Sequence, residues 1–426
     1  MESPFLSLSS KSTIMKKIII GGLLALFFSA CHYTTPSPMA SEILGNPNYQ
    51  AISYSGYRHT TRDSVPTIEE IKEDLLLLAA LDIKLIRTYD TQSPQTLRIL
   101  QAIDALKKEN SHFEMYVMLG AWIDCLNART DSAIHHMEDK VANAKEINLA
   151  IEMTQSYPDI VKVIAVGNEA MVHWATSYFV TPDIILGWVN HLQQLKEAGA
   201  LPKDLWITSS DNFASWGGGS ADYHNAALEA LIKAVDFVSL HTYPFHDTHY
   251  NPSFWLHPSQ HAPQTSNPDL FIVYCQEAIQ KSILYAQNQY QATADYVHQI
   301  DSAKPIHIGE TGWASHDAHL YGPEGSKAAD EIKAALYHKA MRQWTNRKGI
   351  TCFYFEAFDE PWKDAMHPLN SENHFGLFTV DGKAKYVLWE EVDKGTFNGL
   401  TRNNAPIEKT FNGQDSLLYA PVITNK

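Results

Sequence analysis

The chain is short of basic residues and of cysteine. Its 33 Lys and Arg residues stand against 48 Asp and Glu residues, which gives a formal net charge of −15. A protein that binds nucleic acid needs a basic face, so we expect no nucleic-acid partner. The four cysteines are widely spaced and form no C-x-x-C pair, which argues against a zinc ribbon and a thioredoxin-like motif. They are Cys31, Cys125, Cys275 and Cys352.

Sequence patterns for phosphate and metal binding are also missing. No glycine-rich turn follows the first expected strand, and Gly217-Gly218-Gly219 lacks the Lys-Ser/Thr that completes a phosphate-binding loop. One long loop is rich in histidine but has no H-E-x-x-H or paired Cys/His spacing, so we favour ligand-free surface histidines there. These are His246, His249, His257 and His261. We predict neither a metal nor a cofactor.

The first 31 residues have the pattern of an export signal. Residues 1–14 look like an upstream extension, after which Lys16-Lys17 begins a positive region. The apolar run from Ile18 to Phe28 is too short to span a bilayer comfortably. It leads into Phe28-Ser29-Ala30-Cys31, which resembles a bacterial lipobox although Phe stands where Leu is usual. The pattern predicts a signal peptide over residues 1–31.

A lipobox would make Cys31 the lipidated N-terminus of the mature protein. His32 rather than Asp follows it, which favours the outer membrane, and we expect membrane contact only through this lipid anchor. Ordinary cleavage near Ala40, giving a periplasmic or secreted protein, is the alternative. Lipidation leaves three cysteines, an odd number that favours buried free thiols over disulfides. Residues 32–48, with three prolines, indicate a tether.

From residue 49 onward, short apolar strands alternate with helical segments. Strands are expected at 51–57, 82–90, 113–124, 160–170, 205–213, 236–245, 305–315 and 350–360. Helices are expected between them at 68–81, 93–110, 134–157, 181–198, 221–234, 270–300 and 328–347. This alternation predicts an α/β fold, a (β/α)8 TIM barrel that forms a single catalytic domain over 49–395, with a C-terminal tail over 396–426. A doubly wound sheet fits the alternation but would need the missing phosphate turn.

Polar and aromatic residues gather at the carboxyl ends of the expected strands. In a TIM barrel the active site lies at that end, whereas residues with only a structural role would be scattered over both ends. The strand-end residues are Tyr54, Tyr57, Arg87, Tyr89, Trp122, Asp124, Asn168, Glu169, Asp211, Asn212, His241, Tyr243, Glu310, Glu356 and Glu360. We therefore expect a catalytic or binding site at this end of the barrel.

Glu169 and Glu310 end the fourth and seventh expected strands, on roughly opposite sides of a closed barrel. A salt bridge is the structural alternative for either residue alone. Two carboxyl groups that face each other across a sugar are what glycosidic cleavage requires, because one protonates the leaving oxygen and the other attacks or activates water. Asn168 could hydrogen-bond the sugar 2-hydroxyl, and Trp313 could lie under a sugar ring.

Four segments carry a resemblance to a known family. Two of them are similar to signature strands of glycoside hydrolase family 17, the β-1,3-glucanases of clan A. These two segments are Val166-Gly-Asn-Glu-Ala170 and Ile308-Gly-Glu-Thr-Gly-Trp-Ala-Ser315. The other two resemble the eighth strand of that family and the loop after it. They are Phe353-Tyr-Phe-Glu-Ala-Phe-Asp-Glu-Pro-Trp-Lys363 and His374-Phe-Gly-Leu-Phe378. The similarity extends over residues 54–378, almost the whole expected mature chain.

The resemblance implies roles for individual residues. Glu169 would be the general acid/base and Glu310 the nucleophile of a retaining double displacement through a covalent glycosyl-enzyme. Asn168 would bind the 2-hydroxyl, Tyr243 would hydrogen-bond the nucleophile, and Arg87 would support its charge. Such a mechanism needs an ionised Glu310 and a raised pKa at Glu169. Other residues of the cleft and its subsite walls would be Tyr54, Tyr89, Trp313, Glu360, Lys363 and Phe375.

The expected activity is hydrolysis of β-1,3-glucosidic bonds in a laminarin-like glucan, with endo attack favoured. Exo attack and glucan transglycosylation by the same residues stay open, and so does a non-catalytic surface lipoprotein that only binds glycan. In the long loop after the sixth strand, Tyr250 and Trp255 would cover one end of the groove, and a blocked groove would favour exo attack or transfer. The expected partner is a β-1,3-glucan polysaccharide or oligosaccharide, and we expect a monomer.

Overall fold

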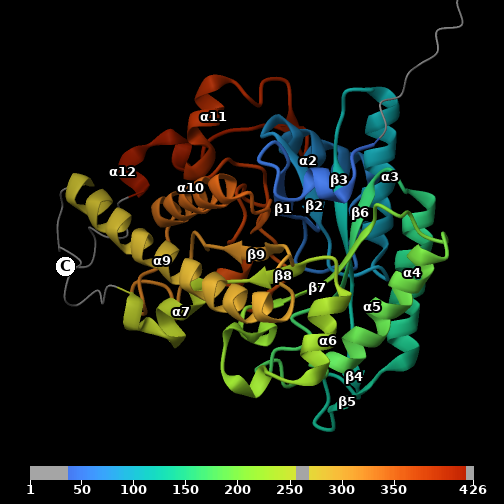
Figure 1. The fold of residues 1–426 in the computed structure, drawn as a ribbon. Coiled ribbons are helices and arrows are strands. Elements are labelled where there is room, and N and C mark those ends of the chain that lie inside the picture. Colours follow the sequence, from blue (N-terminus) through green and yellow to red (C-terminus); the bar gives the residue numbers. More distant parts are fainter. Residues whose placement is uncertain (1–36, 256–267, 419–426) are drawn as a thin grey trace, which may run out of the picture. The chain divides into compact units, whose positions relative to one another are not determined.

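The predicted (β/α)8 barrel is confirmed. The computed structural model describes residues 37–255 and 268–418. Eight parallel strands close in the order β1-β10-β9-β8-β7-β6-β3-β2 (Figure 1), so that strands adjacent in the barrel follow one another along the chain. They are β1 (Gln50–Ser53), β2 (Ile83–Arg87), β3 (Tyr116–Ala121), β6 (Val161–Asn168), β7 (Trp206–Asn212), β8 (Val238–His241), β9 (Ile306–Gly312) and β10 (Cys352–Phe355).

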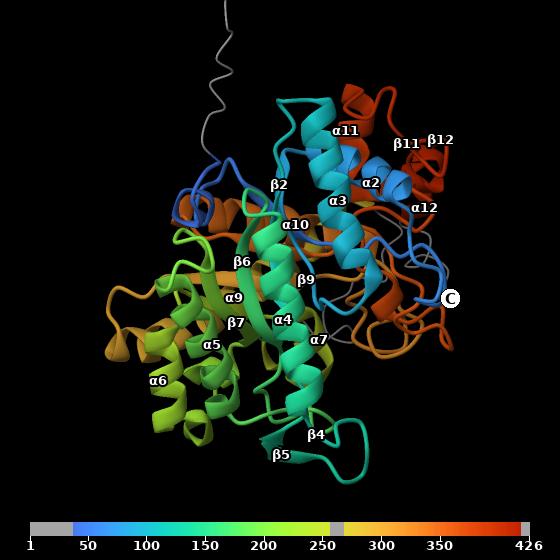
Figure 2. The same cartoon turned by 90° about the vertical axis from the view of Figure 1, so that its right-hand side faces the viewer.

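Helices between the strands surround the barrel, and Figure 2 shows α3, α4 and α5 along one of its sides. A capping box between Thr67 and Glu70 starts α2, and Gly349 in the left-handed conformation ends α10. The principal helices are α2 (Ile68–Ala80), α3 (Pro94–Glu109), α4 (Lys140–Ser156), α5 (Pro182–Glu197), α6 (Ala226–Ala234), α9 (Pro268–Ile300) and α10 (Glu331–Lys348).

The largest differences from the predicted helix starts are at α4 and α6. The segment expected to be helical over 134–157 begins as β5 (Ile134–Glu138), which pairs with β4 (Cys125–Leu126) in an antiparallel hairpin. The helix α4 starts only after Asp139, whose side chain accepts a hydrogen bond from the amide of Ala142. Asn225 caps α6 in the same way, so this helix begins at residue 226 and not at 221. In both cases a capping side chain, and not the apolar spacing, sets the start.

The long loop predicted after the sixth strand begins as a helix, α7 (Pro244–Tyr250), followed by the single 3-10 turn η3 (Pro252–Phe254). Pro244 occupies the first helical position, where its missing N–H costs nothing. The prediction that Trp255 covers the groove is wrong. Its ring packs against Trp313, and its indole N–H donates to the Ser326 carbonyl at 2.8 Å.

The amino-terminal end of the barrel is covered by α1 (Ala40–Ile43). Ile43 is buried with strand residues such as Leu85, Val163 and Phe353, and the amide of Gly45 donates to the Thr351 hydroxyl at the entry to β10. Residues 38–48, predicted as part of the tether, therefore belong to the compact domain. A four-residue helix is not stable alone, so its burial in the domain stabilises it.

The segment predicted as a tail packs on the barrel. After α11 (Trp389–Lys394) it forms a hairpin of β11 (Thr401–Arg402) and β12 (Ala405–Pro406), then α12 (Asp415–Leu418). Arg402 is fully buried, and its Nε donates to Asp74 Oδ1 at 2.8 Å. Arg58 reaches the same oxygen at 2.8 Å. Two guanidinium groups thus compensate one buried carboxylate of α2.

Cys125, Cys275 and Cys352 are buried and free, as predicted, whereas Cys31 lies outside the described residues. Burial raises the pKa of Cys275 to about 12 and that of Cys352 to about 11, which makes both thiols unreactive. In the part of the chain that the structure describes, no helix combines the length and the apolarity needed to cross a membrane.

Candidate active site

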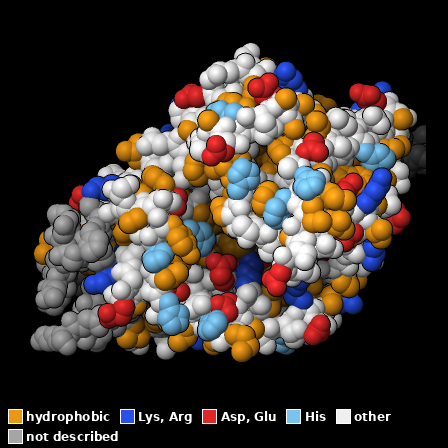
Figure 3. All heavy atoms as spheres, turned by 90° about the horizontal axis from the view of Figure 1, so that it is seen from below, with side chains coloured by type: hydrophobic (Ala, Val, Ile, Leu, Met, Phe, Trp, Pro, Cys, Tyr) orange, Lys and Arg blue, Asp and Glu red, His pale blue; other side chains and the backbone are white. Residues whose placement is uncertain are grey.

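The carboxyl ends of the strands meet at one end of the barrel. The segments that leave them, among them the β4–β5 hairpin and α7, lie at the lower end in Figure 1. Seen from that end, the surface has a hollow in which acidic and basic side chains lie next to each other, with histidines around it (Figure 3). This is the end at which the sequence predicts the site.

Glu310, on β9, accepts hydrogen bonds on both carboxylate oxygens. Arg87 Nη1 donates to Oε2 at 2.7 Å, and the Tyr89 hydroxyl donates to the same oxygen at 2.9 Å. The Tyr243 hydroxyl donates to Oε1 at 2.6 Å. Glu310 is only 8% exposed, and burial alone would raise its pKa. The charge of His241 when its ring is protonated, the charge of Arg87 and the two hydroxyls together outweigh burial, so the pKa of Glu310 lies below its ordinary value.

Arg87, at the end of β2, links Glu310 to β6. Its Nη1 also donates to the Gly309 carbonyl at 2.7 Å, and its Nη2 donates to Asn168 Oδ1 at 2.6 Å. A guanidinium group only donates, so the oxygen of Asn168 is the atom that faces it. The amide nitrogen of Asn168 is therefore left to donate to a ligand in the cavity that this residue lines.

Glu169 follows the last residue of β6 and has a left-handed backbone, with φ of 47°. Such a conformation costs about 1–3 kcal/mol for a non-glycine residue and is found mostly at functional sites. Burial, together with the charge of Glu310, raises the pKa of Glu169 to about 8. At neutral pH Glu169 is therefore protonated while Glu310 is ionised, the arrangement that an acid/base and nucleophile pair needs.

His241, the last residue of β8, is completely buried between the two carboxyl groups. Its Nδ1 lies 3.2 Å from Glu169 Oε1, and its Nε2 lies 3.2 Å from Arg87 Nη1 and 2.7 Å from Ser210 Oγ. Burial lowers the pKa of His241 to about 4, so the ring is neutral at neutral pH. The charge that supports ionised Glu310 under these conditions is that of Arg87.

A second group of charges follows β10. Lys363 Nζ lies 2.9 Å from Glu356 Oε2 and 3.2 Å from Glu360 Oε2. Glu360 also accepts a hydrogen bond from the Ser55 hydroxyl. Burial and the charge of Glu360 raise the pKa of Glu356 well above its ordinary value. The charge of Lys363 thus lies between two carboxyl groups of this segment.

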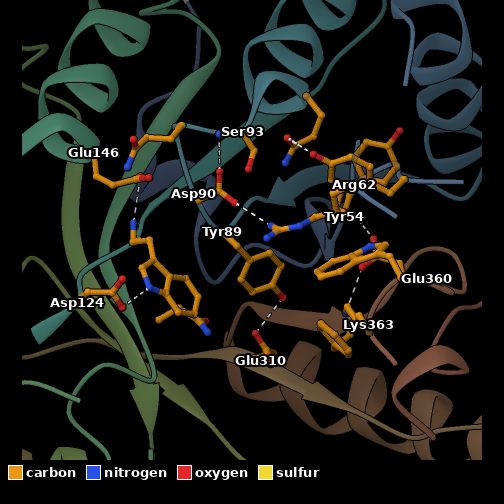
Figure 4. Close-up of a pocket in the computed structure, with 18 of the residues that line it drawn as sticks. Tyr54, Arg62, Tyr89, Asp90, Ser93, Asp124, Glu146, Glu310, Glu360 and Lys363 are labelled. Carbon is orange, nitrogen blue, oxygen red and sulfur yellow. Dashed lines mark hydrogen bonds and ion pairs between the residues drawn. The ribbon is translucent and has the colours of Figure 1, made fainter. Parts of the chain in front are cut away.

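A cavity of about 730 Å³ lies beside Glu310. In Figure 4, Tyr89 points at Glu310, with Glu360 and Lys363 on one side of the cavity and Asp124 on the other. A cavity with aromatic walls and many hydroxyl, amide and carboxyl groups suits a polyhydroxylated ligand. The predicted site residues that line it are Tyr54, Tyr89, Asn168, Glu310, Glu360 and Lys363.

Known proteins share this combination of fold and motifs. The family model of the BtgE/BtgC glycoside hydrolase domain matches residues 51–267. The chain belongs to this glycoside hydrolase family. A solved endo-laminarinase from Formosa is 56% identical, with a TM-score of 0.86 over 90% of this chain and 97% of that one. The resemblance to glycoside hydrolase family 17 is confirmed.

Curated relatives of this glycoside hydrolase are more distant. The glucan 1,3-beta-glucosidase of Arthroderma benhamiae is 27% identical over 244 residues, which are 55% of this chain and 64% of that protein. The chain spans 36% of the putative glucan endo-1,3-beta-glucosidase btgC of Aspergillus niger, at 25% identity over 70% of this chain. A β-1,3-glucanosyltransferase from Rhizomucor miehei shares the fold, at 19% identity and a TM-score of 0.54 over 80% of this chain and 96% of that one.

Two residues predicted as subsite walls of the hydrolase are buried behind the site. Trp313 is 1% exposed, donates its indole N–H to the Ala328 carbonyl at 2.9 Å and packs against Tyr337. Phe375 is also 1% exposed and packs edge-on against Tyr243. The prediction that these two rings contact sugar is wrong. The motifs locate them along the chain but do not give the direction of their side chains.

Other residues of the cavity are absent from the predicted set. The Arg62 guanidinium lies 4.8 Å from the ring centre of Trp362. Arg129, from the β4–β5 hairpin, binds Asp124 at 2.7 Å and lies 5.6 Å from the ring centre of Trp122. Both arginines come from irregular loops that carry no periodic pattern. Trp122 and Asp124 are strand-end residues, and Trp362 lies inside a family motif, so these three could have been included.

Within residues 37–255 and 268–418, no group of three or more His, Cys, Asp or Glu side chains is arranged to hold a metal ion. His246 Nδ1 lies 3.1 Å from the Tyr321 hydroxyl, and the ring of His249 packs edge-on against the same tyrosine. The other two histidines of that loop, His257 and His261, lie outside the described residues.

Proposed function

We propose that the protein is a retaining β-1,3-glucanase that cleaves laminarin-like glucan by endo attack. The observation that carries the proposal is a pair of carboxyl groups, Glu310 buried and Glu169 partly buried, with pKa values pushed apart, Glu169 upward and Glu310 downward, at the catalytic end of one barrel. The similarity to an endo-laminarinase over 90% of the chain supports both the substrate and the endo mode.

In the first step, the Glu310 carboxylate attacks the anomeric carbon, the bond to the leaving oxygen breaks, and Glu169 transfers its proton to that oxygen. The Asn168 amide donates to the sugar 2-hydroxyl, where hydrogen bonds strengthen in the transition state. The ester that forms removes the charge of Glu310, and the pKa of Glu169 falls because that charge had raised it.

In the second step, Glu169 is a carboxylate and takes a proton from water while the water oxygen attacks the anomeric carbon. Glu310 then leaves as a carboxylate, which Arg87 and the Tyr89 and Tyr243 hydroxyls stabilise through the hydrogen bonds already in place. The two displacements at one carbon give the product the configuration of the substrate.

The test is a time course of products from linear β-1,3-glucan, with the anomeric form of the first product read by NMR. We expect oligosaccharides of mixed length early in the reaction and the β-anomer first. Glu310→Ala and Glu169→Gln should each abolish their release, whereas Glu390→Gln, on the exposed helix α11, should not. Full activity in either active-site variant, or α-anomer as the first product, would overturn the proposal.

The same time course separates the alternatives. Glucose as the sole early product indicates exo attack, and products longer than the substrate indicate transglycosylation, in which a sugar hydroxyl replaces water in the second step. The similarity in fold to a β-1,3-glucanosyltransferase makes transfer the second candidate. Binding without any turnover over long incubation would favour a glycan-binding lipoprotein.

We further propose that the enzyme is exported, anchored in the outer membrane through lipid on Cys31, and monomeric, with a periplasmic or secreted form as the alternative. The support is the lipobox-like sequence before Cys31. Cys31→Ser should move the protein from the membrane fraction to the soluble fraction without changing activity per molecule. An unchanged distribution would exclude the anchor, and size-exclusion chromatography with light scattering would test the monomer.

A further inference from the structure

We propose that His241 is a positioning residue that determines which oxygen of Glu169 carries the catalytic proton. The inference rests on the proposed function, because it takes Glu169 as the acid/base. Among the described residues, His241 is the one group that hydrogen-bonds the Glu169 carboxyl, with Nδ1 at 3.2 Å from Oε1. It comes from a barrel strand, so its position is rigid relative to β6 and β9.

The tautomer of His241 follows from its partners. The two protons of Arg87 Nη1 go to the Gly309 carbonyl and to Glu310 Oε2, so the partner that can donate to Nε2 is the Ser210 hydroxyl, 2.7 Å away. The positive charge of Arg87, 3.2 Å from Nε2, disfavours a proton on that nitrogen, so Nε2 accepts from Ser210. A neutral imidazole carries its single proton on the other nitrogen when one nitrogen accepts. The ring is neutral because it is completely buried and lies against a permanent positive charge. Nδ1 therefore carries the proton and donates it to Glu169.

The tautomer fixes the roles of the two Glu169 oxygens. A carboxylic proton on Oε1 would point at the Nδ1 proton, so the acid form of Glu169 carries its proton on Oε2. We infer that Oε2 protonates the leaving oxygen in the first step and accepts the water proton in the second. The other charged or titratable groups around Glu169 and His241 are Arg87, Tyr178, Asp211, His246, Glu310 and Glu372.

A matched pair of variants separates the two ends of the ring. His241→Asn places an amide N–H near the position of Nδ1 and leaves the Nε2 position empty, whereas His241→Gln reaches the Nε2 position and leaves Nδ1 empty. Without the donor, Glu169 loses its orientation, and His241→Gln should lose about 10–100-fold in kcat/KM on glucan, a part of what general acid catalysis contributes. His241→Asn should keep most of that activity.

Two readouts distinguish positioning from simple structural damage. With an activated aryl β-glucoside, whose leaving group needs no acid, the loss in His241→Gln should nearly disappear. The alkaline limb of its pH profile on glucan should move to higher pH, because the lost N–H stabilises the carboxylate of Glu169. Equal losses on both substrates with an unchanged alkaline limb, or unaltered kinetics in both variants, would overturn the proposal.

The tautomer can also be read without any variant. In the wild-type enzyme labelled with ¹⁵N-histidine, the chemical shifts of His241 should show a proton on Nδ1, and a proton on Nε2 would overturn the proposal. Glu169→Gln separates this test from that of the function. If it is inactive on glucan while the His241 result is negative, the positioning role fails and the proposed function stands. If it is fully active, the proposed function fails.

Discussion

Replacing Tyr243 with Phe isolates one hydrogen bond to the proposed nucleophile. The hydroxyl donates to Glu310 Oε1 at 2.6 Å, while the ring packs edge-on against Phe355 and Phe375 and would stay in place. A hydrogen bond to a charged group contributes about 1.5–3 kcal/mol, and about 1.4 kcal/mol corresponds to one pH unit. The bond stabilises the ionised form, so its loss should raise the pKa of Glu310 by about 1–2 pH units.

The measurement is kcat/KM on a laminari-oligosaccharide across the acidic range, where ionisation of the free enzyme's nucleophile sets the acid limb. In Tyr243→Phe this limb should move to higher pH. Tyr89→Phe is the matched control: its hydroxyl donates to Oε2, which keeps its bond to Arg87, so the limb should move less. An acid limb that stays in place in Tyr243→Phe, or moves equally in both variants, would refute the reasoning.

Three further substitutions test the packing around the site. Asp74→Ala should lower the free energy of unfolding by about 3–5 kcal/mol in urea titrations, because it leaves Arg402 buried without a counter-charge. Trp313→Phe should lower the melting temperature and leave KM for glucan unchanged; a raised KM with unchanged melting would restore its subsite role. Gly309→Ala should cost about 1–3 kcal/mol, since the new methyl meets two serine hydroxyls in the barrel, and an unaltered melting curve would contradict this.

The sequence predicts the barrel well because periodicity and strand count are properties of the chain itself. Each strand is a short apolar run, and each long helix has regular apolar spacing, so the alternation is visible without tertiary information. The errors lie where a single polar residue or a distant contact decides the structure. Asp139 starts α4 six residues later than the spacing suggests (140 − 134), and α1 exists because the barrel buries Ile43.

The site is predicted less completely than the fold. Barrel closure brings the ends of β2, β8 and β9 together and so places Glu310 in contact with Arg87, Tyr89 and Tyr243. The positions of these residues at strand ends predict this contact. Side-chain direction is not encoded in the same way. Trp313 is only three residues beyond Glu310, yet its ring points into the core because packing between strands and helices decides which way it faces.

Closure of the barrel between its first and last strands constrains the order of folding. β1 pairs with β10, with Ala51 opposite Phe353, so no N-terminal fragment can complete the sheet before residue 355 has been synthesised. The second counter-charge for Asp74, beside that of Arg58, arrives later still, with residue 402. Contacts over such sequence distances slow folding, and a partial chain exposes unpaired strand edges. We expect the released chain to become resistant to protease in a single late step. We expect no earlier stage at which only one half of the barrel is resistant.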